Sequence, residues 1–257
     1  MGQSRWKHAC IAQEELKMIA LIDSGVNLSM VRSRCNIKGL NIELIEGNLH
    51  INNDFVDNQD HGTNVLNILN EVSADKDYLV IKILDCHLRA TLPQLVEGIK
   101  TAIKWKARII NISCGDTIDS LDLQNITKQC YQNGIVIVSS ISQYYRSFPA
   151  SYPWVIGVNS QTGSKVPELS YAENNHAGFI IKWGTEVKIN GHTRIVPQPA
   201  SYACPIITGL VSRIIAKSPN ADVDQVRHDL IKIIECGRAL NIPVNSESEI
   251  AASRIKQ

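Results

Sequence analysis

Several features that would assign this chain of 257 residues to other classes of protein are scarce or missing. No apolar run reaches membrane-spanning length, and residues 1–13 are polar and contain Arg5, Lys7 and His8, where a secretory signal would be apolar. No block of lysine and arginine stands out and the formal net charge is only +1, so capture of nucleic acid or of an anionic membrane has little support. The sequence therefore favours a peptide or protein as partner, and it leaves the oligomeric state open.

Cysteine is present, but not in the patterns that mark disulfides or metal sites. The seven cysteines are odd in number and none forms a Cys-x-x-Cys pair: Cys10, Cys35, Cys86, Cys114, Cys130, Cys204 and Cys236. This pattern is typical of reduced thiols, so we expect a cytoplasmic protein in which Cys114 and Cys130 act as small core residues. Cys86 and His87 are adjacent, yet no further ligands accompany them, and we expect neither a metal nor a cofactor.

Apolar residues are arranged in alternating strand-like and helix-like segments. Hydrophobic residues make up 44% of the chain and charged residues 20%, which are ordinary values for a globular protein. Continuous apolar runs predict buried strands at residues 17–22, 78–84, 108–113, 135–140, 155–158 and 179–183. Helical spacing predicts helices that begin at His61 and that cover residues 92–107, 121–132, 201–217 and 222–237. This alternation predicts an α/β fold, a single-domain parallel sheet with helices on both faces, spanning residues 1–257.

Two local signals refine this arrangement. Asn190-Gly191 is typical of the turn in a β-hairpin. Asp60 directly precedes the helix that begins at His61, and it is available as the N-cap of that helix. No repeat, low-complexity segment or linker divides the chain.

Three polar residues lie at the ends of these elements in a particular order. Asp23 follows the apolar strand in Ile19-Ala20-Leu21-Ile22-Asp23-Ser24-Gly25, His61 begins a helix in Asp60-His61-Gly62-Thr63, and Ser201 begins another in Ser201-Tyr202-Ala203-Cys204-Pro205. Each alone has an ordinary explanation, because aspartate and serine commonly cap helices and a histidine at a helix start is often a surface residue. Together they place an acid, a base and an alcohol where α/β proteins bind ligands, which favours a serine peptidase.

These ordered segments resemble those of the subtilisin-like (subtilase) serine peptidases over residues 17–217. The chain order Asp, His, Ser is that of subtilisin and differs from the orders in chymotrypsin and the α/β-hydrolases. Residues 110–115 and 148–153, and Pro205 inside the serine helix, also resemble family segments. The resemblance implies a subtilisin-like fold and a catalytic triad of Asp23, His61 and Ser201.

The resemblance also assigns a role to each of these residues. Ser201 is the nucleophile, His61 the base that takes its proton, and Asp23 the group that orients the imidazole. The backbone N–H of Ser201 and the side chain of Gln143 are the expected oxyanion-hole donors. Two segments are expected to bind substrate: Ser113, Cys114 and Gly115, and Ser140, Ile141 and Ser142. Cys204 lies one helical turn after Ser201, but we expect it to pack in the core.

Two segments, residues 142–143 and 199–200, depart from the family pattern and keep an alternative open. Gln143 stands where subtilases carry an oxyanion-hole asparagine, Ser142 stands where they carry glycine, and Pro199-Ala200 replace the usual Gly-Thr before Ser201. A glutamine amide can donate the same hydrogen bond, but its extra methylene moves the donor by about one C–C bond. The alternative is a catalytically impaired pseudo-protease that uses the cleft as a peptide-binding module.

The sequence thus predicts an intracellular serine endopeptidase that cleaves peptide bonds through an acyl-enzyme. Asp23 lies so close to Met1 that we expect no N-terminal propeptide, and a compact cytoplasmic form points to processing of a dedicated precursor or leader peptide. The stretch from His61 to Lys82 is shorter than its counterpart in the secreted calcium-binding relatives. We therefore expect their calcium loop to be absent and no metal to be bound.

Overall fold

A nine-stranded sheet forms the centre of the computed structural model, which describes residues 18–142, 145–164, 166–172, 178–189 and 192–236. The strand order is β3-β2-β4-β1-β5-β6-β7-β9-β8. The strands are β1 (Met18–Asp23), β2 (Asn36–Ile45), β3 (Asn48–Asn52), β4 (Asp77–Lys82), β5 (Ala107–Ile112), β6 (Val136–Ser140), β7 (Ile156–Gln161), β8 (Glu168–Tyr171) and β9 (Phe179–Lys182). Neighbouring strands from β2 to β9 pair in parallel, whereas β3 and β8 join the two edges antiparallel.

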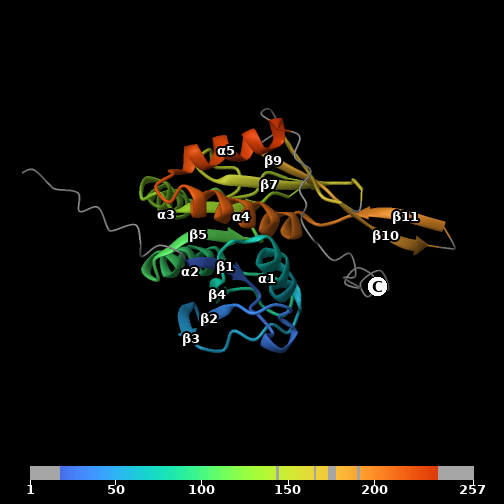
Figure 1. Cartoon of the computed structure of the whole chain (residues 1–257). Coiled ribbons are helices and arrows are strands. Elements are labelled where there is room, and N and C mark those ends of the chain that lie inside the picture. Colours follow the sequence, from blue (N-terminus) through green and yellow to red (C-terminus); the bar gives the residue numbers. More distant parts are fainter. Residues whose placement is uncertain (1–17, 143–144, 165, 173–177, 190–191, 237–257) are drawn as a thin grey trace, which may run out of the picture.

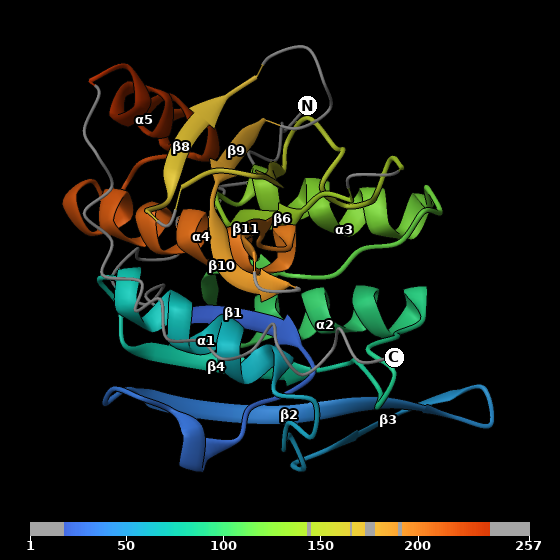
Figure 2. The ribbon, with the colours of Figure 1, turned by 90° about the vertical axis from the view of Figure 1, so that its right-hand side faces the viewer.

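Helices cover both faces of this sheet (Figures 1 and 2). One face packs against α1 (His61–Val72), α4 (Ala200–Lys217) and α5 (Val223–Glu235), and the other against α2 (Leu92–Lys104) and α3 (Leu121–Gln132). Side chains of β1 alternate between the two cores, because Ile19 and Leu21 lie in the first cluster whereas Ala20 and Ile22 lie in the second. The prediction of a parallel sheet with helices on both faces is confirmed.

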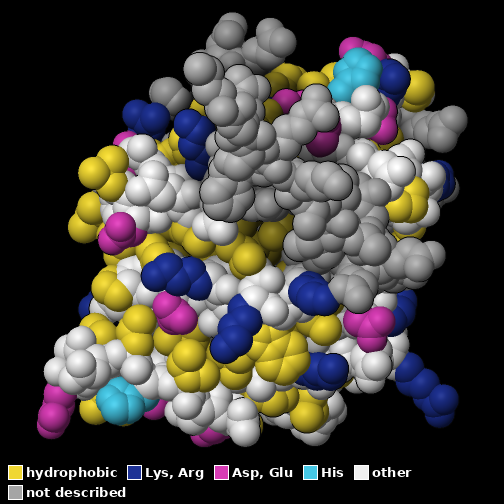
Figure 3. Space-filling model, turned by 90° about the vertical axis from the view of Figure 1, so that its left-hand side faces the viewer, with side chains coloured by type: hydrophobic (Ala, Val, Ile, Leu, Met, Phe, Trp, Pro, Cys, Tyr) yellow, Lys and Arg dark blue, Asp and Glu magenta, His cyan; other side chains and the backbone are white. Residues whose placement is uncertain are grey.

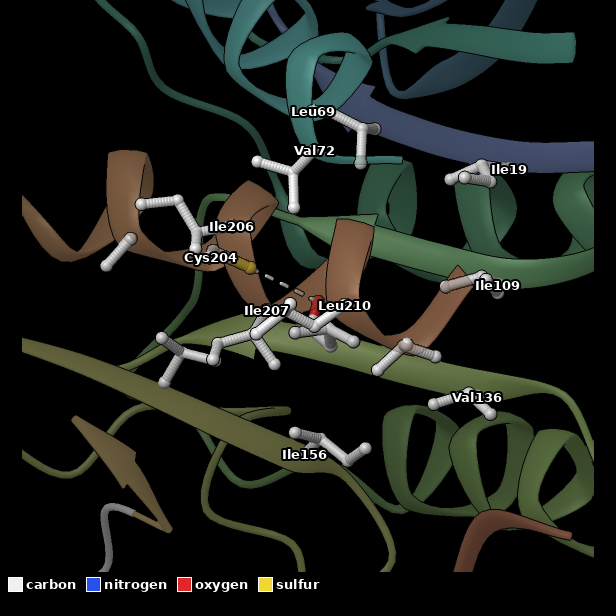
Figure 4. Close-up of a cluster of buried hydrophobic side chains, with 14 of the residues drawn as sticks. Ile19, Leu69, Val72, Ile109, Val136, Ile156, Cys204, Ile206, Ile207 and Leu210 are labelled. Atoms are coloured by element: carbon white, nitrogen blue, oxygen red, sulfur yellow. Dashed lines mark hydrogen bonds between the residues drawn. The ribbon is translucent and has the colours of Figure 1, made fainter. Parts of the chain in front are cut away.

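The first core joins α4 to both α1 and the sheet (Figure 4). Cys204, Ile206, Ile207 and Leu210 of α4 meet side chains from α1 and from four strands: Leu69, Val72, Ile19, Ile109, Val136 and Ile156. These side chains are at most 6% exposed, so α4 is held along its length by apolar contacts. The first turn of α4 is therefore attached to a rigid support.

Some element boundaries and edge strands differ from the sequence prediction. The helix predicted at residues 92–107 ends at Lys104, because Lys106 adopts a left-handed backbone with φ of 60° and β5 begins at Ala107. The helix predicted at 222–237 spans Val223–Glu235. Strands β2, β3 and β8 were not predicted, and every residue of β3 is exposed, so no buried apolar run marks it.

A separate two-stranded hairpin projects from the body beside the start of α4 (Figure 1). Its strands β10 (Gly184–Ile189) and β11 (His192–Pro197) pair antiparallel with Ile189 opposite His192. This pairing confirms the predicted hairpin, although the turn residues Asn190 and Gly191 lie outside the described residues.

On the face opposite the hairpin, lysine and arginine side chains lie among hydrophobic and acidic ones (Figure 3).

Candidate active site

The chain topology creates a crevice at the carboxyl ends of β1 and β5. After β1 the chain passes to β2 on one side, whereas after β5 it passes to β6 on the other, and β1 and β5 are neighbours. Such a reversal opens a ligand crevice at the carboxyl ends of parallel strands. Asp23 is the last residue of β1, and Ser113 follows the last residue of β5. The predicted aspartate is therefore at the switch point of the sheet.

Asp23 and His61 form a short hydrogen bond at this crevice. His61 Nδ1 lies 2.7 Å from Asp23 Oδ1, which also accepts a 2.7 Å hydrogen bond from the backbone N–H of Ser24. Asp23 is fully buried, and the His61 side chain is 12% exposed. Because an ionised carboxylate only accepts hydrogen bonds, Nδ1 carries the proton and Nε2 of the neutral ring has a lone pair. This is the tautomer that a general base requires.

The first turn of α4, which carries Ser201, lies next to the same histidine. The helix begins at Ala200 after Pro199, so the N–H of Ser201 belongs to the first turn, whose donors have no partner inside a helix. The next residue, Tyr202, stacks on His61 with ring centroids 5.4 Å apart and ring planes inclined by 25°. The structure thus gathers Asp23, His61 and the turn that carries Ser201 in one place.

A cavity of about 490 Å³ opens beside Ser201. It is lined by Gly115, Ser140, Ile141, Ser142, Tyr145, Ser147, Gln198, Pro199, Ala200 and Ser201. Four of the six predicted substrate-binding residues are among them, and so is the nucleophile candidate. Gln143 lies outside the described residues, and its role as an oxyanion-hole donor stays a prediction.

The other two predicted substrate-binding residues lie elsewhere. Cys114 lines a second cavity of about 340 Å³, which shares Gly115 and Tyr145 with the first. Ser113 lines neither of these two cavities: it is 6% exposed and accepts a 2.9 Å hydrogen bond from Asn111. Contact between substrate and any of the six residues stays a prediction.

Four residues of the site were not found from the sequence. Tyr145, Ser147 and Gln198 line the first cavity, and Tyr202 covers the His61 ring. Tyr145, Ser147 and Gln198 belong to no motif that specifies a catalytic group, and no spacing in the sequence distinguishes them. Tyr202 lies inside the Ser201 motif, but the motif does not predict a contact with His61. Only the position of Tyr202 directly after Ser201 could have drawn attention to it.

Cys204 packs in the core, as predicted, rather than facing the crevice. It is fully buried among apolar side chains (Figure 4). Its thiol approaches the carbonyl oxygens of Val138 at 3.5 Å and Ile112 at 3.7 Å. Burial raises the pKa of the Cys204 thiol well above its ordinary value, and burial does the same to the pKa of Cys114. A thiolate nucleophile at either position is therefore disfavoured.

The helix that carries His61 is capped by an unexpected residue. Asp60 has a left-handed backbone with φ of 59° and makes no side-chain capping hydrogen bond, so the cap predicted from the sequence is wrong. The buried Asp57 accepts hydrogen bonds from Thr63 instead, at 2.9 Å from its N–H and 2.6 Å from its hydroxyl. Asp57 also accepts a 3.0 Å hydrogen bond from Ser24 Oγ, which in turn accepts one from the Gly62 N–H at 2.9 Å. This network ties the end of β1 to the start of α1.

Glycine is required where these two segments touch. A Cβ on Gly62 would lie 2.3 Å from the carbonyl oxygen of Gly25 and 3.1 Å from Asp23 Oδ1. Gly25 itself has φ of 99°, and a Cβ there would lie 2.3 Å from the carbonyl oxygen of Phe55. The two glycines therefore allow the approach that brings His61 to Asp23.

Replacing Asp57 is expected to destabilise the fold. In Asp57→Ala the N–H and hydroxyl of Thr63 and the hydroxyl of Ser24 lose their acceptor in a buried position, so the free energy of unfolding should fall by about 3 kcal/mol. Urea unfolding of the full chain measures this. Asp54→Ala is the matched control, because Asp54 is exposed and its side chain accepts a long 3.3 Å hydrogen bond from the backbone N–H of Val56. Equal stability of the two variants would contradict the capping role of Asp57.

Two acidic residues between His61 and Lys82, the stretch where we expect no calcium loop, interact with side chains of the protein. Glu71 pairs with Arg32 at 4.0 Å, and Asp77 accepts a 3.0 Å hydrogen bond from Asn36. Within the described residues, no group of three or more histidine, cysteine, aspartate or glutamate side chains is arranged to hold a metal ion.

In the part of the chain that the structure describes, no helix is both long and apolar enough to cross a membrane.

Comparison with known proteins relates this site to a family. The chain is 26% identical over 230 residues to Subtilisin amylosacchariticus of Bacillus subtilis subsp. amylosacchariticus, an alignment that covers 82% of this chain and 58% of the relative. It is 25% identical over 230 residues to Subtilisin of Bacillus pumilus, covering 82% of this chain and 81% of the relative. The chain thus spans less than two thirds of the first relative and most of the second.

A solved structure and a family model extend this comparison. The structure described as a cold adapted subtilisin-like serine proteinase matches with a TM-score of 0.66 at 17% identity, over 89% of this chain and 84% of that chain. This likeness establishes the fold as subtilisin-like. The model of the subtilase family matches residues 17–241, which include Asp23, His61 and Ser201. The chain therefore belongs to the subtilase family.

Proposed function

We propose that this protein is a serine endopeptidase that cleaves peptide bonds through an acyl-enzyme on Asp23, His61 and Ser201. The observation that carries the proposal is the 2.7 Å Asp23–His61 hydrogen bond, whose imidazole stacks on Tyr202, the neighbour of the cavity-lining Ser201. An alcohol is a weak nucleophile, so it needs a base of the correct tautomer next to it. The buried Asp23 carboxylate provides that tautomer.

The proposed reaction has two halves. Ser201 Oγ attacks the peptide carbonyl carbon while His61 Nε2 takes its proton, and the carbonyl oxygen becomes an oxyanion. The N–H of Ser201 in the first turn of α4 points positive charge at that oxygen. His61 then donates the proton to the leaving amine, and the C–N bond breaks to leave an ester on Ser201. Water, deprotonated by His61, hydrolyses the ester and restores the serine.

A peptide or protein is the substrate that the family and the cavity support. None of the described residues lining the cavity beside Ser201 is charged. A charged side chain entering it would lose its hydration without gaining a partner of opposite charge. We therefore propose that the residue next to the scissile bond is neutral.

A fluorophosphonate probe tests the activity directly, because it forms a covalent adduct only with an activated serine. We expect the full chain to be labelled at Ser201, located by mass spectrometry of a digest, and Ser201→Ala to stay unlabelled. A wild-type chain that binds peptides but resists the probe would instead be the peptide-binding pseudo-protease.

We further propose that the protein acts inside the cell on a dedicated precursor or leader peptide. The described cysteines Cys35, Cys86, Cys114, Cys130, Cys204 and Cys236 are all free thiols, which supports a reducing compartment. One relative, Minor extracellular protease Epr of Bacillus subtilis, is extracellular by name, so location needs its own measurement. Peptide masses compared between cells with the wild type and with Ser201→Ala should reveal an uncleaved precursor, and identical masses would refute the processing role.

Gln143 is the proposed second donor to the oxyanion. In Gln143→Ala we expect kcat to fall by about 10²–10³ with little change in KM, since this hydrogen bond forms fully only in the transition state. Steady-state kinetics on a peptide ester or amide measures the change. Gln143→Asn tests the length of the side chain: a higher kcat would mean that glutamine reaches the oxyanion poorly. Unchanged kinetics in both variants would leave the Ser201 N–H as the main donor.

A further inference from the structure

Asp23 and Tyr202 contact different parts of the His61 imidazole. Asp23 fixes one atom of the ring, through the 2.7 Å hydrogen bond to Nδ1. Tyr202 covers one face, at a centroid distance of 5.4 Å and an inclination of 25°. These values are within the range of offset stacking between aromatic rings. The two contacts constrain different motions, because one acts on an edge of the ring and the other on its plane.

A single hydrogen bond does not set the direction of the opposite ring nitrogen. The imidazole is joined to the backbone through the rotatable Cα–Cβ and Cβ–Cγ bonds. With Nδ1 bonded to Asp23, coupled rotation about these bonds can still pivot the ring plane and move Nε2 away from a nucleophile. A second ring packed against the face opposes the pivot. The group that covers the imidazole face therefore contributes to the orientation of Nε2.

Tyr202 is attached both to the nucleophile and to the core. It directly follows Ser201 in the first turn of α4, and its N–H donates a 3.0 Å hydrogen bond to the carbonyl of Pro199. Its half-buried side chain packs against the first core cluster, which holds α4 to the sheet. Because Tyr202 belongs to the turn that carries Ser201 and also stacks on His61, it couples the position of this turn to the orientation of the histidine ring.

We propose that Tyr202 is a positioning residue that aims His61 Nε2 at Ser201 by stacking on the imidazole. The inference rests on the proposed peptidase function and adds a residue to its machinery. In this proposal the aromatic ring of Tyr202 orients His61, and the phenolic hydroxyl is not required for that orientation.

Three substitutions of Tyr202 distinguish the effect of the aromatic ring from the effects of side-chain volume and of the hydroxyl. Tyr202→Phe keeps the ring, whereas Tyr202→Leu and Tyr202→Met fill the space with apolar groups that cannot stack. We expect Phe to keep kcat within about twofold, and Leu and Met to lower kcat by about three- to tenfold with KM nearly unchanged, the rate equivalent of one aromatic pair. Retained kcat in both Leu and Met, or an equal loss in all three variants, would overturn the proposal.

Nuclear magnetic resonance of the full chain with labelled histidine gives a second measurement that needs no turnover. Tyr202 should shift the His61 ring protons by its ring current, and a low-field resonance should report the Nδ1 proton in the bond to Asp23. We expect Phe to preserve both signals, and Leu and Met to lose the ring-current shift and broaden the low-field resonance. His61→Ala identifies the signals.

The two measurements distinguish failure of this inference from failure of the proposed function. If the wild type has no peptidase turnover but its ring-current shift depends on the aromatic ring, the proposed function fails and the stacking is upheld. If turnover is normal and the His61 signals are the same in wild type, Leu and Met, the inference fails alone. Thermal unfolding of each variant shows whether a lost signal reflects misfolding. If either Tyr202→Leu or Tyr202→Met fails to fold, the other variant provides the test of the stacking role.

Discussion

Ser201→Ala and His61→Ala are each expected to lower kcat for peptide cleavage by about 10⁶ while leaving the fold intact. The reason is that nucleophile and base act on one proton: without the base the alcohol is not activated, and without the alcohol the base has nothing to activate. Combining both substitutions should therefore cost hardly more than either alone. Steady-state kinetics on a fluorogenic peptide, with circular dichroism as a check on folding, measures all three variants.

Matched controls for these substitutions are available on the same molecule. Ser218→Ala changes an exposed serine at the other end of α4, and His50→Ala changes an exposed histidine on β3. Both should keep kcat close to that of the wild type. Substantial turnover in purified Ser201→Ala or His61→Ala would refute the assignment of the triad, and additive losses in the double variant would mean that the two residues act independently.

Asp23→Asn is expected to lower kcat by about 10⁴. Asp23 Oδ1 accepts hydrogen bonds from both Ser24 and His61, and Oδ2 has no hydrogen-bond partner among the described residues. An asparagine that keeps its oxygen at these two donors removes the negative charge that would stabilise the imidazolium. An asparagine that turns its nitrogen to His61 forces the tautomer in which Nε2 carries the proton and cannot act as base.

The same kinetic assay measures Asp23→Asn, and nitrogen chemical shifts of labelled histidine report its tautomer. Asp54→Asn, an exposed aspartate outside the site, is the control and should leave both unchanged. A loss of kcat smaller than about tenfold would mean that the carboxylate is not needed to orient or stabilise His61.

The parts of the fold that the sequence predicted are those with a strong local signal. Central strands such as β1 and β5 are buried on both faces, so they appear as continuous apolar runs, and the helices repeat their apolar residues every three to four positions. The edge strand β3 is exposed along its length and carries no such run, and for this reason it was missed. The end of α2 was misplaced because the left-handed backbone of Lys106 has no residue signature such as glycine.

The candidate site divides in the same way. The sequence itself identified Asp23, His61 and Ser201 as the candidate triad, because each occupies the end of a strand or helix that the apolar pattern marks and because the three motifs resemble those of the subtilases. Gly25 and Gly62 belong to the same short motifs. The sequence also determined the chain order of the helices and of the buried strands, but not the positions of β2, β3 and β8. These features depend only on neighbours within a few residues.

Tertiary structure alone decided which other residues support that site. The cap of α1 is Asp57 and not the adjacent Asp60, since the buried carboxylate reaches Thr63 and Ser24 only after the loop folds back on β1. Tyr202 covers His61 because the packing of α4 against α1 and the sheet places its first turn there. Contacts between segments so far apart in the chain depend on the angles and distances at which elements pack. No local pattern of residue types records those angles and distances.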